Sequence, residues 1–431
     1  MALPPVCMIL AGGKGTRLNA LAWHRAKPAV PFAGIHRLID FTLSNAMNSG
    51  IMRVGVLTQY LPLSLMEHIG TGGAWDMSAR TRECRILPPT EGVSAKDWYK
   101  GTAHAVLKNK DFIYKGNEDD ILILSGDHIY QMDYRPMIQF HRKKKSVFTI
   151  ATMPVPMHEA HRFGIAVTDN SNQIIEFQEK PETPKNNLGS MGIYVAKRDA
   201  VMKKIAELAH DGKHDIGAHL VPSLIPEGRV YAFPHEGYWR DVGTLDSYWQ
   251  TSMDFLYPQK SNVDLHRWNM RTNMESTHLC LRPPARFEKS AFVTQSTISQ
   301  GCRINGKVYR SILAPGVVVG KGAEVVNSIV FDDTIIENNC RIHHTIADKN
   351  VRICQYSELI PTETNCPNDM FPEHLTSGLI LLGKDSLIPE KSKLGSNCLV
   401  YPFVKKCDWN LKTLKSGCSV KTSRYTNGEQ I

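Results

Sequence analysis

The chain has 431 residues, of which 42% are hydrophobic and 22% charged, so it is long enough for two or three folded domains, and disorder throughout is excluded. Its formal charge of +9 favours anionic partners without requiring nucleic acid. The main basic run, HRKKK at 141–145, is interpreted as the solvent-facing end of a helix rather than as a nucleic-acid patch.

Up to about residue 250, short apolar runs alternate with helical patterns. This alternation predicts a Rossmann-like α/β domain with a mostly parallel sheet, whose ligands gather at the carboxyl ends of the strands. The clearest predicted strands are Val6–Leu10, Arg53–Thr58, Ile121–Leu124, Val147–Thr152, Ile174–Phe177 and Ile193–Val195, and the clearest predicted helices are Thr102–Tyr114 and Asp199–His210.

The first of these strands runs into a loop that contains Gly12, Gly13 and Gly15 together with Lys14 and Arg17. Glycines let a backbone turn tightly and present its N–H groups, and the two basic residues add positive charge. The pattern predicts a phosphate cradle, although a structural turn is the alternative. It is neither a Walker A loop nor a GxGxxG fingerprint, because Leu18 stands where the last glycine would be.

After about residue 290 the period of the apolar residues becomes six. A six-residue period with turn-forming residues between the apolar ones predicts a left-handed parallel β-helix over residues 291–400, and an irregular β-sandwich is the alternative. Residues 256–290 are expected to be a linker, and 401–431 a tail without repeats. The recurring residues are Ile298 with Ile304, Val319 with Val325, Ile329 with Ile335, the series Val318, Val330, Ile336 and Ile342 with Glu324 as its odd member, and Ile388, Leu394 and Val400.

Several motifs are shared with one enzyme family. LAGGKGTRL at 10–18 and RAKPAVPFAG at 25–34 resemble the signature of the sugar-nucleotide pyrophosphorylases, and later stretches resemble those of the bacterial glucose-1-phosphate adenylyltransferases among them. The resemblance covers residues 6 to about 380 and implies a nucleotidyltransferase catalytic domain over 1–255, followed by a β-helix with roles in oligomerisation and regulation. The later stretches are WYKGTAHAV (98–106), SGDHIY (125–130), IIEFQEKP (174–181), SMGIY (190–194) and YWRDVGT (238–244).

In this chemistry a phosphate oxygen of glucose 1-phosphate attacks the α-phosphorus of a nucleoside triphosphate, and diphosphate leaves in line. The nucleophile is already ionised, so the protein must supply cations, a divalent metal and accurate placement. Asp127, at the end of an apolar strand, and Asp241 are the expected Mg²⁺ ligands. Their alternatives are a helix N-cap for Asp127 and an ion pair with Arg240 for Asp241.

The resemblance also implies roles for individual residues. Arg17, Lys27 and Asp127 are expected to be catalytic, with Arg17 on the β and γ phosphates. Lys180 is expected to pair with the phosphate of glucose 1-phosphate and Glu179 to accept bonds from sugar hydroxyls, although an exposed Glu–Lys pair is usually only surface. The implied nucleotide-binding residues are Leu10, Ala11, Gly12, Gly13, Gly15, Thr16, Arg17, Gln59, Gly101, Thr102 and Asp127, and the implied substrate-binding residues are Tyr99, Gly164, Glu179, Lys180, Ser190, Met191, Gly192 and Asp241.

The chain departs from the family pattern at several positions. His104 stands where an aspartate is usual, and His24 and Pro31 replace a lysine and a histidine of the enteric pattern. Neutral imidazoles hold a bisphosphate less well than lysine or arginine, so activation by sugar phosphates is predicted to be weak or altered. The residues implied in binding phosphorylated effectors, namely sugar phosphates and AMP or ADP, are His24, Arg25, Arg37, Ser64, Lys115, His343 and His344.

Alternative functions are a transferase that uses dTTP, UTP or GTP in place of ATP, and a catalytically weak regulatory subunit of the same fold. The hexad repeats also fit acyltransferases, but their repeat arrays usually dominate the chain. Family members are usually homotetramers, so a homotetramer is expected. The ten cysteines lack a CxxC pair, and no signal peptide or membrane span is recognisable, which predicts a cytoplasmic protein without zinc, membrane or nucleic-acid partners.

Overall fold

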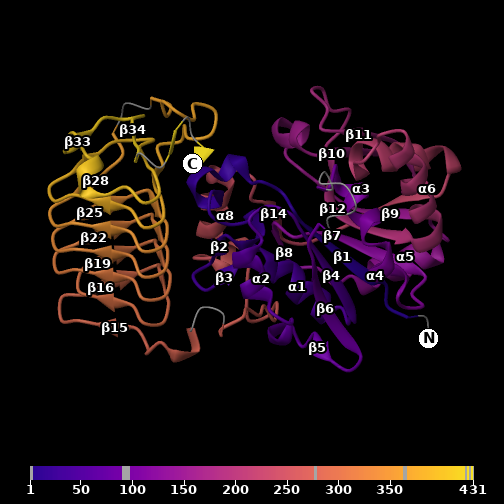
Figure 1. Ribbon diagram of the computed structural model, residues 1–431, viewed down its shortest axis with the longest axis horizontal. Helices are drawn as coiled ribbons and strands as arrows, with labels where there is room; N and C mark the ends of the chain where they lie inside the picture. The colour runs from indigo at the N-terminus through magenta and orange to yellow at the C-terminus, as the bar shows by residue number, and fades with distance from the viewer. Residues whose placement is uncertain are drawn as a thin grey trace. The chain divides into compact units, whose positions relative to one another are not determined.

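The computed structural model describes residues 3–89, 98–275, 279–362, 366–422, 425–426 and 429–430. The chain divides into two compact units, each shown in Figure 1. Unit 1 consists of Met1–Gly13, Ile39–Trp239 and His266–Arg271, and unit 2 of Lys14–Leu38, Arg240–Leu265 and Thr272–Ile431. The glycine-rich loop is therefore divided between them after Gly13.

Unit 1 is built on a ten-stranded sheet, counted over the described residues, with the order β11-β10-β12-β7-β1-β4-β6-β5, to which β9 and β13 add beside β12. The parallel strands predicted from the sequence are confirmed for β1, β4 and β7, and β6, which the sequence did not predict, is parallel to β4. In contrast, β12 runs antiparallel to β7 and β9. The strands are β1 Val6–Ala11, β4 Arg53–Thr58, β5 Ser78–Ala79, β6 Arg82–Leu87, β7 Asp120–Ser125, β9 Phe148–Pro154, β10 Gly164–Thr168, β11 Ile174–Glu179, β12 Leu188–Lys197 and β13 Val230–Pro234.

The central strands are buried on both faces, which is why they read as unbroken apolar runs. Val6 and Met8 of β1 belong to the cluster packed against α3, α4 and α6, while Cys7 and Ile9 point the other way and are buried as well. The helices are α1 Leu38–Asn48, α2 Leu63–Ile69, α3 Thr102–Lys108, α4 Lys110–Tyr114, α5 Arg135–Lys143, α6 Arg198–His210 and α7 Val221–Leu224 in unit 1, with α8 Leu245–Asp254 and α9 Pro258–Ser261 in unit 2.

Two helix predictions need correction. The predicted helix Thr102–Tyr114 is two helices, α3 and α4, because the chain leaves the helical conformation at Asn109. The HRKKK run does end a helix, α5, and its lysines are exposed, but His141 is buried beneath them. No helix in the described residues is long and apolar enough to cross a membrane.

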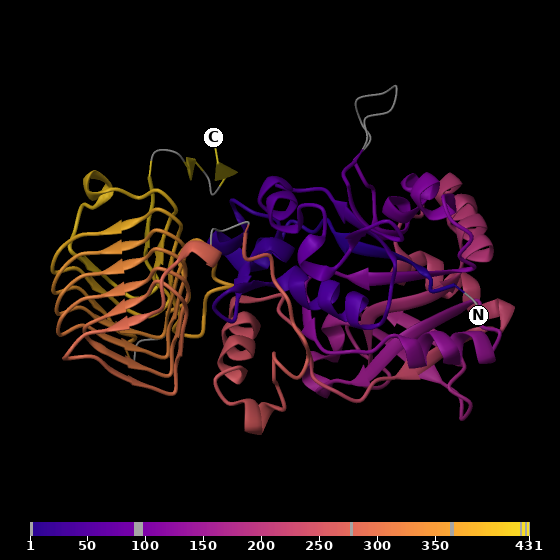
Figure 2. The same ribbon diagram turned by 90° about the horizontal axis from the view of Figure 1, so that it is seen from below.

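Unit 2 carries the predicted β-helix, visible in Figures 1 and 2 as stacked coils of short strands. Three parallel sheets form its faces in the described residues, with the strand orders β15-β18-β21-β24-β27-β30, β16-β19-β22-β25-β28-β31-β33 and β17-β20-β23-β26-β29-β32-β34. The bounds run from β15 Arg286–Phe287 to β34 Ser419–Val420. Strands therefore continue to Val420, although the sequence shows no repeat after residue 400.

The strands of the β-helix not yet given are β16 Phe292–Thr294, β17 Thr297–Ile298, β18 Arg303–Ile304, β19 Lys307–Tyr309, β20 Ile312–Leu313, β21 Val318–Val319, β22 Glu324–Val326, β23 Ile329–Val330, β24 Ile335–Ile336, β25 Arg341–His343, β26 Thr345–Ala347, β27 Arg352–Ile353, β28 Glu358–Leu359, β29 Ile380–Leu382, β30 Leu387–Ile388, β31 Lys393–Leu394, β32 Leu399–Val400 and β33 Thr413–Leu414.

The inward positions differ in part from the predicted series. Val319, Ile336 and Ile353 stack in register at 17-residue spacing, so the steps around one coil are six, five and six. Val325, Val330 and Ile342 also point inward, whereas Val318 and Glu324 lie on the outer side. Glu324 is therefore not an odd member of a strict hexad series, because the series itself shifts by one residue.

The remaining elements connect these parts. In unit 2 the segment 14–38 contains the 3₁₀ helices Thr16–Ala22 and Lys27–Ala29 and a small hairpin of β2, Pro31–Phe32, and β3, His36–Arg37. The short strand β8, His128–Tyr130, directly follows the SGD motif. The short strand β14, Trp239–Asp241, consists of the WRD motif.

Candidate active site

In unit 1, three neighbouring parallel strands end at the same edge of the sheet. Leu10 pairs with Ser125 and Ala11 with Thr58, so the glycine loop, Gln59 and the SGD motif all follow strands at this edge. The Gly126 N–H donates to the Leu10 carbonyl at 3.0 Å, which fixes the two loops to each other. The predicted nucleotide residues Leu10 to Gly13, Gln59 and Asp127 therefore share one end of the sheet.

Gly12 allows a close approach within this group. A Cβ atom at Gly12 would lie 3.1 Å from the Cβ of Gln59, closer than ordinary packing permits. The Gln59 side-chain amide in turn donates to the Tyr99 carbonyl at 3.1 Å, so Gln59 joins the glycine loop to the predicted sugar-binding tyrosine.

Asp127 is half-buried just beyond the end of β7. Its Oδ1 accepts a hydrogen bond from the Ser125 hydroxyl at 2.5 Å, and His128 Nε2 lies 3.7 Å from the same oxygen. The residue after Asp127 begins the strand β8, so the alternative role as a helix N-cap is wrong. Asp127 is thus held by its neighbours in an extended segment at the ligand-bearing edge.

The SMGIY motif lies beside Asp127. The His128 ring bonds through Nδ1 to the Met191 carbonyl at 3.1 Å, and Gly192, at φ +68°, faces Ser125 and His128. The pairing of β12 with β9 slips between Ser190 and Tyr194, and such a bulge redirects side chains. Met191 and Gly192 therefore lie beside the SGD motif, and the sugar-binding role that the family pattern implies for them and for Ser190 stays a prediction.

Glu179 and Lys180 stand at the end of β11. Their charged atoms are 3.4 Å apart, and Lys180, at φ +46°, is 66% exposed whereas Glu179 is 27% exposed. Burial raises the pKa of Glu179, while Lys180 opposes that rise and Asp215 adds to it. A Cβ at Gly164 or Gly217 would come within 3.0 Å and 2.1 Å of Glu179 Oε2, so both glycines make room for this carboxylate.

The GTA turn is fixed to the segment at 214–216. A Cβ at Gly101 would lie 2.4 Å from the His214 carbonyl oxygen, and the Thr102 hydroxyl donates to Asp215 at 3.0 Å. His104 Nδ1 accepts the Lys100 N–H at 3.2 Å, so the imidazole keeps an acceptor at the start of α3 where the family pattern has an aspartate. Gly101 and Thr102 are therefore rigidly placed beside Tyr99.

Unit 2 contains a second group of predicted residues. Lys27 Nζ lies 3.7 Å from Asp241 Oδ1, and a Cβ at Gly243 would be 2.9 Å from Asp241 Oδ2 and 3.0 Å from Arg17 Nη2. Gly15, at φ +66°, precedes the helix that carries Thr16 and Arg17, and it packs on the Lys27 side chain. Arg17 is exposed, whereas Lys27 is buried, so two cations with different access to solvent surround one carboxylate.

The alternative partner for Asp241 was Arg240. In the structure Arg240 Nε lies 4.0 Å from Asp254 Oδ2, while Asp241 is 3.7 Å from Lys27. Asp241 therefore faces the cationic residues of the glycine loop and the AKP turn.

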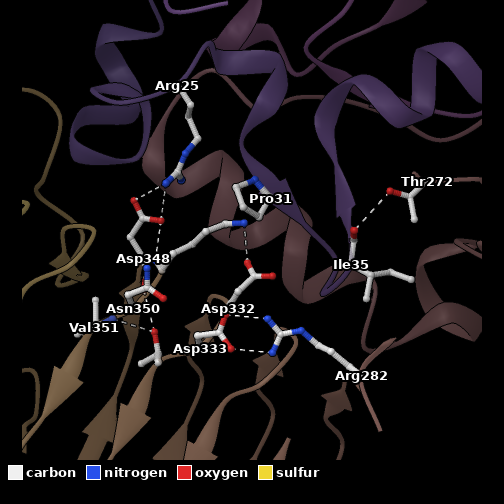
Figure 3. Close-up of polar contacts among 12 residues, drawn as sticks. Arg25, Pro31, Ile35, Thr272, Arg282, Asp332, Asp333, Asp348, Asn350 and Val351 are labelled. Carbon is white, nitrogen blue, oxygen red and sulfur yellow. Dashed lines mark hydrogen bonds and ion pairs between the residues drawn. The ribbon is translucent and has the colours of Figure 1, made fainter. Parts of the chain in front are cut away.

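Arg25, one of the residues predicted to bind effectors, is engaged in an internal ion pair of unit 2 (Figure 3). Arg25 Nη2 bonds to both carboxylate oxygens of Asp348, at 2.9 and 3.1 Å, with the two side chains 6% and 1% exposed. Lys349 pairs with Asp332 at 2.9 Å, and burial lowers the pKa of Lys349, with Arg37 and Arg25 acting in the same direction. Arg25 and Arg37 are buried and therefore poorly exposed to a soluble effector.

The remaining residues of that set are dispersed. His24 packs edge-on against Phe403, and burial lowers the pKa of its imidazole. His343 contacts Glu324 at 3.2 Å, and His344 packs on Trp249, where burial lowers its pKa. In unit 1, Lys115 pairs with Glu83 at 2.9 Å, and Ser64 lies at the start of α2.

The structure adds site residues that sequence reasoning did not single out. Ser125, His128 and Gly243 lie inside the motifs SGDHIY and YWRDVGT, so the motifs could have pointed to them. Asp215 caps the short π-helix Ile216–Leu220, which contains Gly217. The segment has no recognisable motif, and only the folded chain brings Asp215 to Thr102 and Gly217 to Glu179. Among the described residues no cluster of three or more His, Cys, Asp or Glu side chains could hold a metal ion.

Two family models match the chain. The model described as nucleotidyl transferase matches residues 6–257, and the one described as GlmU-like C-terminal hexapeptide matches residues 283–360. The chain is thus a nucleotidyltransferase that carries a C-terminal hexapeptide-repeat domain, as the sequence predicts.

Full-length relatives define the subfamily. The chain is 45% identical over 398 residues to the glucose-1-phosphate adenylyltransferase of Thermosipho melanesiensis, covering 92% of this chain and 95% of the relative. It is 42% identical to the enzyme of the same name from Thermotoga sp. (strain RQ2), covering 96% and 97% of the two chains, and 37% identical to that of Acetivibrio thermocellus over the same fractions. The chain belongs to the glucose-1-phosphate adenylyltransferase family.

Proposed function

We propose that this protein joins ATP and α-D-glucose 1-phosphate to form ADP-glucose and diphosphate, and so supplies the glucosyl donor for glycogen or another α-glucan. The observation that carries the proposal is the placement of Arg17 and Lys27 around Asp241 beside Gly243. Arginine and lysine side chains at this place are the groups that bind phosphate oxygens.

In the proposed reaction an oxygen of the glucose 1-phosphate attacks the α-phosphorus of ATP. The new P–O bond forms as the bond to the bridging oxygen of the β-phosphate breaks, and diphosphate leaves with the electron pair. The attacking oxygen is ionised at neutral pH, so no protein base is required. The protein lowers the barrier by aligning the two reactants and by neutralising the charge that builds on the leaving group.

The residues divide this work. Arg17 and the backbone N–H groups of the glycine loop hold the β and γ phosphates, and Lys27 lies against the reacting phosphate. Lys180, 66% exposed at the end of β11, pairs with the phosphate of glucose 1-phosphate. Glu179 accepts hydrogen bonds from sugar hydroxyls, since the Gly164 and Gly217 backbones leave its carboxylate accessible in a half-buried position.

Asp127 and Asp241 are the proposed ligands of a Mg²⁺ ion, which nucleotidyltransferases of this kind generally use. Carboxylate oxygens are the donors this ion prefers, and it commonly takes only one or two from protein while substrate phosphates and water complete its shell. When bound, the ion supplies charge neutralisation at the phosphates.

The proposal is tested by diphosphate release from glucose 1-phosphate with ATP, UTP, dTTP and GTP in turn, with and without Mg²⁺. Turnover with ATP that requires the metal is the expected result. Turnover confined to UTP or dTTP would reassign the base, and no turnover with any nucleotide would favour a regulatory subunit of the same fold.

We also propose that phosphorylated effectors act weakly on this protein. Burial keeps the His24 and His344 imidazoles uncharged near neutral pH, and Asp348 already occupies the Arg25 guanidinium. A steady-state assay with fructose 1,6-bisphosphate is expected to show little activation. A large effect at low concentration would contradict this.

For its assembly and location we propose a homotetramer in the cytoplasm. The open ends of a β-helix offer strand edges that another subunit can cover. Light scattering coupled to gel filtration measures the assembly directly, and a monomer at micromolar concentration would contradict the proposal.

A further inference from the structure

A pocket of about 410 Å³ lies in unit 1, at the edge of the sheet opposite the candidate active site. Asp120 at the start of β7, Lys197 at the end of β12 and Arg229 just before β13 line it, together with His141, Arg142 and Lys145 from the end of α5. The helix α5 packs on β9, β12 and β13 there (Figure 1). Since β7 alone separates Asp120 from Asp127 by about 20 Å, the pocket is distinct from the catalytic edge.

The pocket has an excess of positive charge. Four basic side chains, Arg142, Lys145, Lys197 and Arg229, face two acids, Asp119 and Asp120. Asp120 is 2% exposed and is already bonded to Arg142 at 2.7 Å, with Lys197 3.7 Å away. In the described part of the chain Lys145 and Arg229 form no ion pair.

Basic residues at the end of a helix commonly do no more than complement its dipole. A dipole role covers Arg142 in the last turn of α5 and Lys145 two residues beyond it. It does not cover Lys197 at the end of β12 and Arg229 just before β13, which line the same pocket. Four cations from three elements around one cavity are the arrangement that binds a dianion.

His141 provides the second, independent observation. Its side chain is 2% exposed, and its Nε2 has no hydrogen-bond partner, the nearest acidic oxygen being Asp120 Oδ1 at 3.9 Å. A buried ring nitrogen without a partner costs free energy unless a ligand or water satisfies it. His141 belongs to the lining of the pocket, so this nitrogen is available to an occupant.

The hydrogen bonds around His141 define what that nitrogen can do. Ser146 Oγ lies 2.9 Å from the Phe148 carbonyl and 3.0 Å from that of Arg229; these oxygens can only accept, so the Ser146 proton goes to them. The Thr149 hydroxyl therefore donates to Ser146 at 3.1 Å and accepts from His141 Nδ1 at 2.9 Å. With its proton on Nδ1, the neutral ring presents Nε2 as an acceptor.

Burial lowers the pKa of His141 to about 4, with Asp120 opposing that change and Lys197 and Arg142 adding to it. The ring is therefore neutral at physiological pH, in agreement with the hydrogen-bond pattern. His141 Nε2 and Asp120 Oδ1 are both acceptors, so an occupant that contacts them must supply a hydrogen-bond donor such as a hydroxyl. The cations at the mouth select an anion and the acceptors at the base select a donor.

We propose that this pocket is a binding site for a small phosphate monoester that also carries a hydroxyl group. The phosphate lies among Lys145, Arg229 and Lys197, and the hydroxyl donates to His141 Nε2. The site is independent of the nucleotide and sugar sites proposed above and of the predicted effector residues of unit 2, so binding there can be measured separately from catalysis.

Calorimetric titration of the full-length protein tests the proposal, with glycerol 3-phosphate as the probe and inorganic phosphate and glycerol as single-feature comparisons. The variant Lys145→Ala/Arg229→Ala is expected to weaken glycerol 3-phosphate binding at least tenfold. The matched variant Lys143→Ala removes a charge from the same helix end outside the pocket, and it is expected to stay within twofold of the unmodified protein.

Inorganic phosphate is expected to bind more weakly than glycerol 3-phosphate, and glycerol alone not to bind. Unchanged binding in the double variant, an equal loss in Lys143→Ala, or equal affinity for inorganic phosphate would overturn the proposal. A second readout needs no variant: the ¹⁵N resonance of His141 Nε2 is expected to shift when the probe is added, and a constant resonance would contradict the hydroxyl contact. Unaltered turnover of ATP and glucose 1-phosphate in the double variant separates this result from any failure of the proposed function.

Discussion

Unit 2 contains two groups of charged residues. Both consist of arginine, lysine and aspartate side chains, but we assign them different roles. Around Gly243, Lys27 Nζ lies 3.7 Å from Asp241 Oδ1, and a Cβ on the glycine would lie 2.9 Å from Asp241 Oδ2 and 3.0 Å from Arg17 Nη2. In the network of Figure 3, Arg25 has its own acid in Asp348 and Lys349 has its own in Asp332. The first group is the one proposed to hold the triphosphate, whereas the second consists of buried ion pairs.

Exposure separates the two groups further. Arg17 is open to solvent, but the Arg25 and Asp348 side chains are 6% and 1% exposed. A buried, paired charge is strongly destabilising when one partner is lost, while an exposed and unmatched charge affects stability little and ligands much. Burial therefore distinguishes a binding group from a structural one even where the residue types are identical.

The largest expected effect is a loss of catalysis when the group around Gly243 is altered. Arg17→Ala should lower kcat/KM for ATP by about a thousandfold, because an arginine on a transferring phosphate contributes on that scale. Arg17→Lys should recover only part of the loss, since lysine lacks the planar fork. The comparison needs Arg303→Ala, on the outer side of β18, which should keep full activity. Equal activity in Arg17→Ala and Arg303→Ala would remove Arg17 from the site.

The group of buried ion pairs should respond in stability instead. Asp348→Asn leaves the Arg25 guanidinium buried without its counter-charge, and the free energy of unfolding should fall by about 3–5 kcal/mol. Asp333→Asn, which breaks the more exposed pair with Arg282, should cost about 1 kcal/mol or less. Urea unfolding measures both. Equal small effects of the two variants would contradict a large contribution of the buried Arg25–Asp348 pair to stability.

The next prediction concerns Glu179 in unit 1, which is proposed to accept hydrogen bonds from the sugar hydroxyls of glucose 1-phosphate. Glu179→Gln should raise KM for glucose 1-phosphate by about 10- to 100-fold with little change in KM for ATP, because a hydrogen bond to a charged acceptor is lost. Burial raises the pKa of Glu179, so the carboxylate becomes protonated at a higher pH than an ordinary glutamate does.

The accepting, charged form of Glu179 is present above that raised pKa and is lost as the pH falls through it. KM for glucose 1-phosphate should therefore rise more steeply on acidification in the unmodified protein than in Glu179→Gln, where only the protonation of the substrate phosphate remains. A pH profile identical in the two proteins would contradict the assigned role.

The smallest expected effect concerns space rather than charge. Gly243→Ala would place a methyl group 2.9 Å from Asp241 and 3.0 Å from Arg17, and the flexible Arg17 side chain can move away. KM for ATP should rise by roughly tenfold, the equivalent of about 1.4 kcal/mol. Gly73→Ala, where a Cβ meets nothing nearer than 3.8 Å, is the matched control and should be neutral.

The parts of the fold that follow from local pattern were predictable from the sequence. Buried parallel strands such as Arg53–Thr58 are continuous apolar runs, and β4 has those bounds. The β-helix was predictable from its period, but the inward phase was not, since one five-residue step moves Val318 and Glu324 outward. The strands after residue 400 have no period, because they depend on the coil already formed beneath them.

The candidate site divides in the same way. Residues inside motifs, such as Asp127 and Lys180, could be proposed as site residues from the sequence, because a short motif is enough to indicate their chemistry. Contacts between distant segments were not, and Thr102 with Asp215 or Arg25 with Asp348 emerge only from the folded chain. His141 shows the same limit, since its neighbours in sequence are exposed lysines while its own ring is buried.

The most direct test of the proposed chemistry is the Mg²⁺ dependence of ADP-glucose formation in Asp127→Asn and Asp241→Asn, beside Asp133→Asn as an acid paired with Arg135 outside the site. Both site variants should lose about 10²- to 10³-fold in kcat and require more Mg²⁺, while Asp133→Asn matches the unmodified protein. Full activity with an unchanged Mg²⁺ requirement in either site variant would contradict a metal held by these two carboxylates.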